Sequence, residues 1–368
     1  MSRKIVIDAR ESGTSTGRYI DKLIEHMDKL HPEHQIIILT HAERTEFFAN
    51  ISPNFIIIQT PFKEFTFDEQ VGFLRQLRGL NADLVHFGMV QQPVMYHGST
   101  ITTMHDLTTA RFTNPDKNPL TFKVKQLVYK WVNKTAARKS AAIITPTQYV
   151  KDDVADFTGV NPEKITVTYE AADYITDTPA PVEGLAGKQF IMYLGRPTPH
   201  KNLGRLIAAF VELHKTHPSL HLVLAGKKDA NYRRHEARVS AEHIPNVIFT
   251  DFISDAQLRW LYEHCSAYIF PSLSEGFGLP GLEAMVHGAP VVSSNATCLP
   301  EVYGDAAHYF DPLDVSDMAA KITSVIDDPA LRGQLVEKGK QQARKYSWDQ
   351  MAEQTLDLYE SVLNNAKL

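Results

Sequence analysis

Short apolar runs alternate with longer amphipathic segments along most of the chain. The first run, Lys4–Ile7, precedes a segment whose apolar residues recur at helical spacing. The same order then repeats. It predicts strands at Lys4–Ile7, Gln35–Leu39, Phe55–Ile58, Leu84–Phe87, Thr100–Thr103, Ala142–Thr145 and Lys164–Val167. Because strands joined by helices pair in parallel and are covered on both faces, this pattern predicts an α/β fold.

The alternation pauses at Asp177–Gly187, a segment rich in proline, glycine and alanine that is typical of a linker. A second series follows, with strands predicted at Phe190–Leu194, Leu220–Ala225, Val247–Phe249, Ala267–Phe270, Pro290–Ser293 and His308–Phe310. Helical patterns are clearest at Leu203–His214, Asp255–Glu263 and Gly281–His287. We therefore expect two Rossmann-like, doubly wound domains, at residues 1–176 and 177–345. Residues 346–368 are expected to form a helix that packs back across the N-terminal domain.

Composition narrows the class of protein. The 368 residues are 43% hydrophobic and 22% charged, which is typical of a globular chain with more than one core. The two cysteines, Cys265 and Cys298, cannot form a disulfide framework, which fits a reducing compartment. The start of the chain lacks the pattern of a signal peptide, and no apolar run reaches about 18 residues. We expect a cytoplasmic protein, and the net charge of −5 gives no reason to expect nucleic acid as a partner.

A glycine-rich turn from Glu275 to Glu283 follows the predicted strand Ala267–Phe270. A helix is expected to begin near Pro280, because proline suits a first helical position. The glycines allow the backbone to approach a ligand, and the N–H groups at a helix start attract anions. The glutamates are then candidates to accept hydrogen bonds from hydroxyl groups. The alternative is a structural turn whose glutamates are solvated.

Two basic residues lie in the loop Gly195–Asn202 (GRPTPHKN), which follows the carboxyl end of another predicted strand. Arg196 can grip two phosphate oxygens, and Lys201 adds a point charge. Asn202 is expected to cap the following helix. Taken alone, this loop is also compatible with an ordinary solvated turn.

Two turns in the first half are further candidates. His105 follows the strand Thr100–Thr103 and precedes Asp106, so it can face a ligand or serve as a structural histidine. The turn Gly13–Tyr19, which contains Gly17, resembles a phosphate-binding loop but lacks the GxGxxG spacing. The chain has no DxD triplet, no HExxH, no GxSxG and no Walker loop. We therefore expect no metal and no cofactor.

Taken together, these segments resemble family 4 of the retaining glycosyltransferases, which have the two-domain GT-B fold with a cleft between the domains. The resemblance runs over nearly the whole chain, and its most specific parts are YLGRPTPHKNLGRLIAAF and PSLSEGFGLPGLEAM. The family's catalytic residues match His105, Arg196, Lys201 and Glu275 here. Its donor-binding residues match Gly17, Arg196, Lys201, Phe252, Ile253, Glu275, Gly276, Phe277, Gly278, Leu279 and Glu283.

The resemblance also implies a role for each of these groups. The two cations would hold the diphosphate of a nucleotide sugar, Glu283 would hold the ribose, and Glu275 would lie near the hydroxyls of the transferred sugar. His105 would lie beside the donor sugar, and Gly17 near the diphosphate and the acceptor. The loop Thr250–Ser254, with Phe252 and Ile253, would contact the base through backbone groups.

The expected activity is transfer of a hexose from a nucleotide sugar to a glycan or lipid-linked acceptor, without a metal and with retention of the anomeric configuration. The first choice of donor is GDP-mannose, because the chain resembles bacterial mannosyltransferases of glycan assembly. Two alternatives are a sugar-nucleotide epimerase and a non-catalytic protein that binds sugar nucleotides. The oligomeric state is not predicted.

Residues 117–139 are rich in lysine and arginine and contain no acidic residue. The apolar residues of this segment lie at helical spacing: Leu120, Val124, Leu127, Val128, Trp131 and Val132. Such a helix suits contact with an anionic membrane surface, which would make the protein peripheral at the inner face of the plasma membrane. The alternative is a helix that packs its apolar face on the core.

Overall fold

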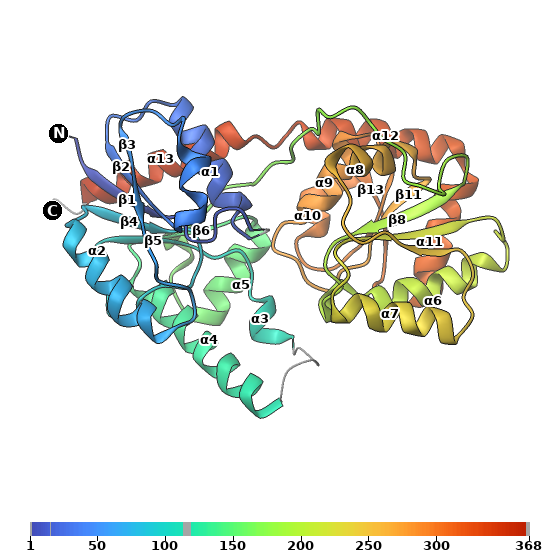
Figure 1. The fold of residues 1–368 in the computed structure, drawn as a ribbon, viewed down its shortest axis with the longest axis horizontal. Coiled ribbons are helices and arrows are strands. Elements are labelled where there is room, and N and C mark those ends of the chain that lie inside the picture. The colour runs from blue at the N-terminus through green and yellow to red at the C-terminus, as the bar shows by residue number, and fades with distance from the viewer. Residues whose placement is uncertain (1, 15, 113–118, 366–368) are drawn as a thin grey trace. The chain divides into compact units, whose positions relative to one another are not determined.

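A computed structural model describes residues 2–14, 16–112 and 119–365, with the backbone only for 119–122. The described residues form two compact units (Figure 1). The first contains the described residues of Met1–Arg111, Lys117–Glu170 and Ser347–Leu368. The second contains those of Phe112–Asp116 and Ala171–Tyr346.

The first unit is built on a parallel sheet. Over the described residues its order is β3-β2-β1-β4-β5-β6-β7. The strands are β1 (Lys4–Asp8), β2 (Gln35–Thr40), β3 (Phe55–Gln59), β4 (Leu84–Phe87), β5 (Thr100–Thr103), β6 (Ala142–Thr145) and β7 (Ile165–Val167). The helices are α1 (Arg18–Lys29), α2 (Leu74–Leu80), α3 (Thr108–Arg111), α4 (Pro119–Lys139), α5 (Gln148–Thr158) and α13 (Trp348–Asn365). Short helices η1 (Ala42–Phe48), η2 (Glu69–Phe73) and η3 (Pro162–Lys164) complete the unit.

The second unit repeats this plan. Its parallel sheet has the order β10-β9-β8-β11-β12-β13 in the described part of the chain. The strands are β8 (Phe190–Leu194), β9 (His221–Ala225), β10 (Val247–Phe249), β11 (Ala267–Phe270), β12 (Val291–Ser294) and β13 (Ala307–Phe310). The helices are α6 (Leu203–His214), α7 (Ala230–Ala241), α8 (Asp255–His264), α9 (Leu279–Val286), α10 (Leu299–Tyr303), α11 (Val315–Asp327) and α12 (Pro329–Ala343), with short helices η4 (Pro199–Lys201) and η5 (Gly304–Ala306).

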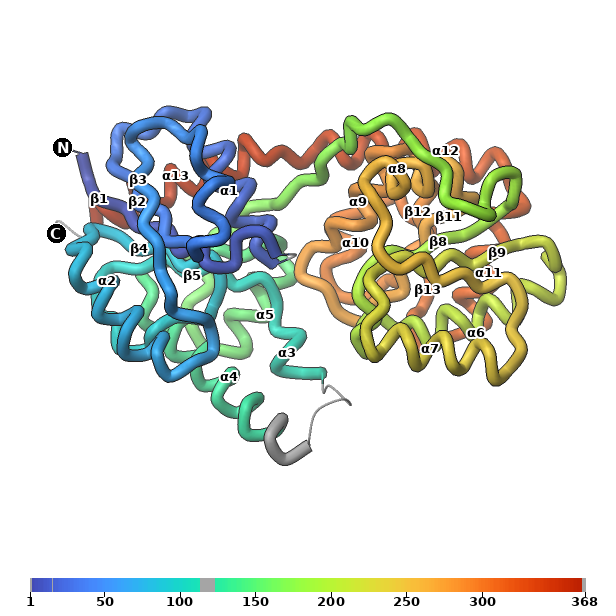
Figure 2. Tube along the Cα trace, viewed as in Figure 1, coloured from blue at the N-terminus to red at the C-terminus, as the bar shows by residue number. Residues whose placement is uncertain are grey.

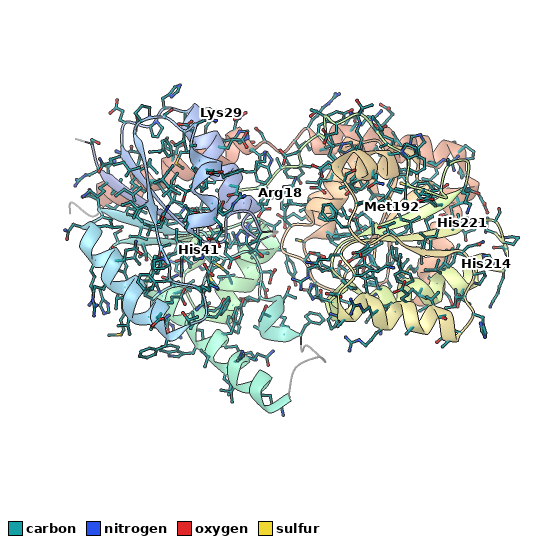
Figure 3. The ribbon with its side chains drawn as sticks, in the orientation of Figure 1. Arg18, Lys29, His41, Met192, His214 and His221 are labelled. Carbon is teal, nitrogen blue, oxygen red and sulfur yellow. The ribbon has the colours of Figure 1, made fainter. Side chains whose placement is uncertain are left out.

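Both sheets are doubly wound, as the alternation of apolar runs predicts. The central strands are buried on both faces: Ile5, Val6 and Ile7 of β1 are fully buried, and so is Met192 of β8, which Figure 3 labels. Strands buried on both faces have continuous apolar sequences rather than alternating ones. This explains why the sequence predicts each strand to within a residue or so of its observed ends.

The C-terminal helix α13 belongs to the first unit, although it follows the second unit in sequence. It packs beside α1, and Figure 2 shows the end of the chain in red next to the blue N-terminal helix. His26 of α1 pairs with Asp349 of α13 at 2.5 Å. The chain leaves the first unit after Glu170, before the segment Asp177–Gly187 whose composition is typical of a linker. Segments rich in proline, glycine and alanine also occur in loops that run over the surface of one domain. Asp177–Gly187 is such a loop of the second unit, where the Ala180 N–H donates to the carbonyl of Ala256.

Candidate functional site

Strand order in the second unit brings two predicted segments together. β8 pairs directly with β11, although β9 and β10 lie between them in sequence. The loops that follow these two strands therefore leave the sheet side by side. The backbone N–H of Leu273 donates to the carbonyl of His200 at 2.7 Å, and Lys201 Nζ lies 2.5 Å from Glu275 Oε1. The structure thus joins the GRPTPHKN loop to the glycine-rich turn.

The ion pair of Lys201 and Glu275 is largely shielded from solvent. The side chains are 19% and 12% exposed, and the ammonium group lies 5.6 Å from the ring centre of Phe270. The N–H of Glu275 donates to Thr297 Oγ1 at 3.2 Å. The thiol of Cys298 donates to the carbonyl of Glu275 at 3.3 Å, and burial raises the pKa of that thiol, with the charge of Glu275 adding to the effect. Removing either partner of a shielded pair leaves an uncompensated charge, so the pair holds the turn in place.

Arg196 does not join this ion pair. Its side chain is 75% exposed, and its guanidinium lies 3.9 Å from Asp229 Oδ2. Asp229 caps α7 by accepting from the N–H groups of Asn231 and Tyr232. Arg196 therefore lies on the open side of its loop, and an incoming anion can replace its long contact with Asp229.

Asn202 lies at the predicted cap position of α6, but its side chain does not cap the helix. Asn202 has a left-handed backbone with a φ of 62°, and its Nδ2 donates to the carbonyls of Pro271 and Pro312 at 3.0 and 2.7 Å. The prediction of side-chain capping is therefore wrong. Its Nδ2 satisfies two carbonyls that need a donor, and its Oδ1, the atom that would cap an N–H, instead accepts from Arg205 Nη1 at 3.0 Å. Asn202 thereby anchors the cationic loop to the end of β11.

The glycines at the start of α9 are required by packing within the protein. Gly278 has a φ of 96°, and a Cβ on Gly281 would lie 2.2 Å from the hydroxyl of Tyr303. That hydroxyl donates to the carbonyl of Gly278 at 2.5 Å, and Tyr303 is fully buried and cannot move aside. The sequence predicts that these glycines let a ligand approach the backbone. The structure adds a second cause, because close contact with Tyr303 alone explains Gly281.

Glu283 lies in α9 and is 9% exposed. Its Oε2 accepts from the hydroxyl of Tyr262 at 3.3 Å. Nearby on the same turn, Gly276 and Gly278 are buried, Leu279 is half-buried, and Phe277 packs edge-on against Tyr346 at 5.5 Å. Along the chain, the start of α9 therefore lies between two shielded carboxylates, those of Glu275 and Glu283.

The predicted base-contacting loop follows β10. The ring of Phe252 is 83% exposed, while Ile253 is half-buried. Asp251 forms a bridge with Gly226, and its carboxylate accepts from the N–H of Lys228 at 2.9 Å. This ties the loop to the end of β9, so that Phe252 projects from a fixed turn at the same edge of the sheet.

In the first unit, Gly17 lies at the cap position just before α1. A Cβ here would lie 1.7 Å from the carbonyl oxygen of Glu11, so only glycine fits. The N–H of Gly17 donates to Thr14 Oγ1, and the N–H of Gly13 donates to Asp21. These two N–H groups of the turn are therefore engaged within the protein rather than directed at a phosphate.

His105 follows β5 and is about one-fifth exposed. Its Nε2 lies 3.0 Å from the carbonyl oxygen of Gly88, and its Nδ1 lies 3.3 Å from Glu170 Oε1. The ring of Tyr19 meets the imidazole edge-on at 4.9 Å. His105 and Gly17 belong to the first unit, and the other predicted site residues belong to the second.

Several residues that contact the predicted site residues are not themselves predicted from the sequence. These partners are Glu170, Asp229, Tyr262, Thr297 and Tyr303. Each lies far along the chain from its partner or carries no motif. Glu170 and Asp229 gave a usable signal, because each is an acidic residue shortly after a predicted strand, where ligand-facing groups gather.

Neither a metal-binding cluster nor a membrane-spanning helix is found in the described part of the chain. Its histidines, cysteines and carboxylates do not gather into a group of three or more that could hold a metal ion. None of its helices combines the length and apolar content needed to cross a bilayer.

Family models match both units. The model described as Glycosyltransferase Family 4 matches residues 16–174, and that described as Glycosyl transferases group 1 matches residues 179–342. Among curated proteins, the O-antigen chain mannosyltransferase B of Escherichia coli is 31% identical over 277 residues, covering 70% of this chain and 69% of the relative. The serotype-specific mannosyltransferase WbdA of the same species is 30% identical, but the chain spans only 31% of its length.

Solved structures share the fold at lower identity. A sucrose-phosphate synthase from Thermosynechococcus elongatus superposes with a TM-score of 0.78 at 17% identity, covering 99% of this chain and 100% of the other. HepE from Anabaena, in complex with UDP and glucose, gives a TM-score of 0.74 at 17% identity, with coverages of 98% and 100%. At these identities the similarity shows the fold.

Proposed function

Because the chain belongs to the family 4 glycosyltransferases and has their two-domain GT-B fold, we propose that it transfers a hexose from a nucleotide sugar to a glycan or lipid-linked acceptor with retention of configuration. The contact between Lys201 and Glu275 carries this proposal. It joins a cationic loop to a carboxylate turn at the carboxyl edge of one parallel sheet, where α/β proteins bind ligands. The cationic loop supplies the positive charge that a diphosphate needs, and the carboxylate turn supplies the hydrogen-bond acceptors that a sugar needs.

The proposed reaction needs positive charge where the leaving diphosphate develops its negative charge. Lys201 and Arg196 would supply it, and Lys201 would exchange Glu275 for phosphate oxygens when the donor binds. Glu275 would then accept from hydroxyls of the transferred sugar, and Glu283 from those of the ribose. The acceptor would attack on the face that the diphosphate leaves, and the diphosphate would take the acceptor's proton. The role of His105 beside the donor sugar follows from the family resemblance.

GDP-mannose is the proposed donor. The mannosyltransferases that match the chain at about 30% identity support mannose as the sugar. Two alternatives compete with transfer. An epimerase would change the sugar without an acceptor, and a non-catalytic binder would leave the sugar nucleotide intact.

One assay separates the three functions. We expect labelled mannose to leave GDP-mannose only when an acceptor is present, and the reaction to continue in EDTA because no metal is proposed. The donor base can be chosen beforehand by thermal shift with UDP, GDP, ADP and their sugars. A ligand at 100 times its Kd stabilises a protein by about 2.7 kcal/mol. Conversion of the sugar without acceptor would support the epimerase, and binding without turnover would support the non-catalytic protein.

A membrane surface is the proposed location of the acceptor, and α4 is the proposed contact. Four apolar side chains of α4 are more than half exposed: Val124 (55%), Leu127 (66%), Val128 (53%) and Trp131 (56%). Among the other α4 residues of the prediction, Val132 is buried, and the side chain of Leu120 lies outside the described residues, as do residues 117 and 118. These four residues do not pack on the core, contrary to the alternative that α4 buries its apolar face. Lysines beside them, including Lys123 and Lys125, would meet anionic headgroups at the inner face of the plasma membrane.

Flotation with vesicles tests this contact. We expect the protein to float with vesicles that contain phosphatidylglycerol at low salt, and the double variant Leu127→Ser/Trp131→Ser to remain in the soluble fraction. Phe67→Ser is the matched control, because Phe67 is 81% exposed in the first unit but lies outside α4. Loss of binding in both variants, or no binding by the wild type, would contradict the proposal.

A further inference from the structure

His105 is surrounded by groups that determine where its protons lie. Its Nε2 lies 3.0 Å from the carbonyl oxygen of Gly88, which can only accept a hydrogen bond, so this nitrogen carries a proton. In a neutral imidazole the other nitrogen, Nδ1, would then present a lone pair. That lone pair would face Glu170 Oε1 at 3.3 Å, which is repulsive when the carboxylate is charged. A doubly protonated imidazolium instead donates on both sides.

The other groups around His105 do not supply a competing charge. His86 of β4 is fully buried, and burial lowers its pKa to about 3, with the charge of His105 adding to the effect, so His86 is neutral. Burial raises the pKa of the Tyr19 hydroxyl on α1, so it too is neutral. Asp106 acts on His105 in the same direction as Glu170 but more weakly, and its carboxylate accepts from the N–H of Thr108 at 2.7 Å.

The balance of these effects favours the charged ring. Burial is the largest single effect and would lower the pKa of His105, but the contact with the Glu170 carboxylate, together with smaller contributions from the Gly88 carbonyl and Asp106, outweighs it. The pKa of His105 is therefore raised above its ordinary value. Glu170 itself is 7% exposed at its side chain and follows β7 as the last residue before the chain enters the second unit.

We propose that Glu170 is a positioning residue that holds His105 as an imidazolium with a fixed ring orientation. The consequence for catalysis rests on the proposed transferase function. A histidine that already carries both protons cannot accept the proton of the acceptor hydroxyl, so His105 is not a general base. It contributes a positive charge, and the proton leaves with another group, as in the proposed transfer to the departing diphosphate.

Titration of the ligand-free, full-length protein by NMR tests the proposal without any enzyme assay. The ring signals of His105 are identified by their loss in His105→Asn. We expect the wild-type ring to be doubly protonated at neutral pH, and its pKa to fall in Glu170→Gln, which keeps the shape of the side chain but removes its charge. Asp106→Asn is the matched control and should lower that pKa less, and Glu170→Asp should retain part of the effect. An unchanged titration in Glu170→Gln, or a singly protonated ring in the wild type, would overturn the proposal.

The pH dependence of stability gives a second test. A pKa raised in the folded state stabilises the protein below the unfolded-state pKa of about 6.5, and this stabilisation disappears as the pH rises through the folded-state pKa. The difference in stability between wild type and Glu170→Gln should thus be largest at mildly acidic pH, where the imidazole is charged and carboxylates are ionised, and shrink toward alkaline pH. A difference that is constant with pH would mean that Glu170 only packs, which contradicts the proposal.

The pH dependence of enzyme activity tests the catalytic consequence separately from the NMR measurement. The ratio of kcat/KM between wild type and Glu170→Gln should grow with pH, by about tenfold for each unit by which the pKa falls. A protein without transferase activity would refute the proposed function, and the NMR result would still decide whether Glu170 charges His105. A ratio that does not change with pH, in an active enzyme, would overturn the catalytic consequence.

Discussion

Replacing Lys201 with alanine is expected to lower kcat at saturating donor by about 100- to 1,000-fold, the usual cost of removing one donor that faces a developing anion. The ammonium group is already shielded from solvent and lies 2.5 Å from Glu275, so exchanging that carboxylate for a phosphate oxygen at the same edge of the sheet replaces one negative partner with another. Its contribution grows as the diphosphate gains charge, so the loss falls mainly on kcat rather than on the KM for the donor.

Two variants separate this effect from a general loss of charge or fold. Lys215→Ala removes an exposed lysine at the end of α6 and should keep the wild-type rate. Lys201→Arg keeps the charge and should retain part of the activity. Thermal unfolding must be followed in parallel, because Lys201→Ala also leaves Glu275 without its partner. Wild-type turnover by Lys201→Ala at saturating donor would show that this assignment is wrong.

The pairing of Lys201 with Glu275 also shows which parts of the site can be predicted from the sequence. Both loops are predictable, because each follows an apolar run that is long enough only for a strand and each begins with turn residues. That the two loops meet depends on strand order. β8 and β11 are neighbours only because β9 and β10 pair on the other side of β8, and no local pattern encodes that order. Only the resemblance to a family predicts that the two loops serve the same ligand.

Side-chain partners were less accessible from sequence. Asn202 has the residue type and position of a helix cap, yet it donates to two carbonyls that come from distant parts of the chain. Gly281 is explained by Tyr303, which approaches it from another helix. For α4, helical spacing predicts an apolar stripe but does not tell whether it faces the core. Exposure of Leu127 and Trp131 depends on how the helix is docked.

Replacing Glu283 with glutamine is expected to raise the KM for the donor by about 10- to 100-fold while kcat changes little. Hydrogen bonds to a charged group are worth about 1.5–3 kcal/mol, and a carboxylate that is 9% exposed is shielded from competing water. Glutamine is neutral, and a donating NH2 group replaces one of the two accepting oxygens, so it should receive the two hydroxyls of a ribose more weakly than the carboxylate does. Tyr262→Phe is the matched control, because it keeps the carboxylate and removes only the hydroxyl that donates to it at 3.3 Å.

Comparison of two ligands distinguishes the roles of Glu283 and Glu275. The ribose is present in both a nucleoside diphosphate and its sugar derivative, so Glu283→Gln should weaken the binding of both by a similar factor in calorimetry. The transferred sugar is present only in the derivative, so Glu275→Gln should weaken the nucleotide sugar more than the nucleoside diphosphate. Equal losses for both ligands in both variants would mean that the carboxylates only support the turn. The reverse pattern would exchange their assignments, because each carboxylate can discriminate only the group that it contacts.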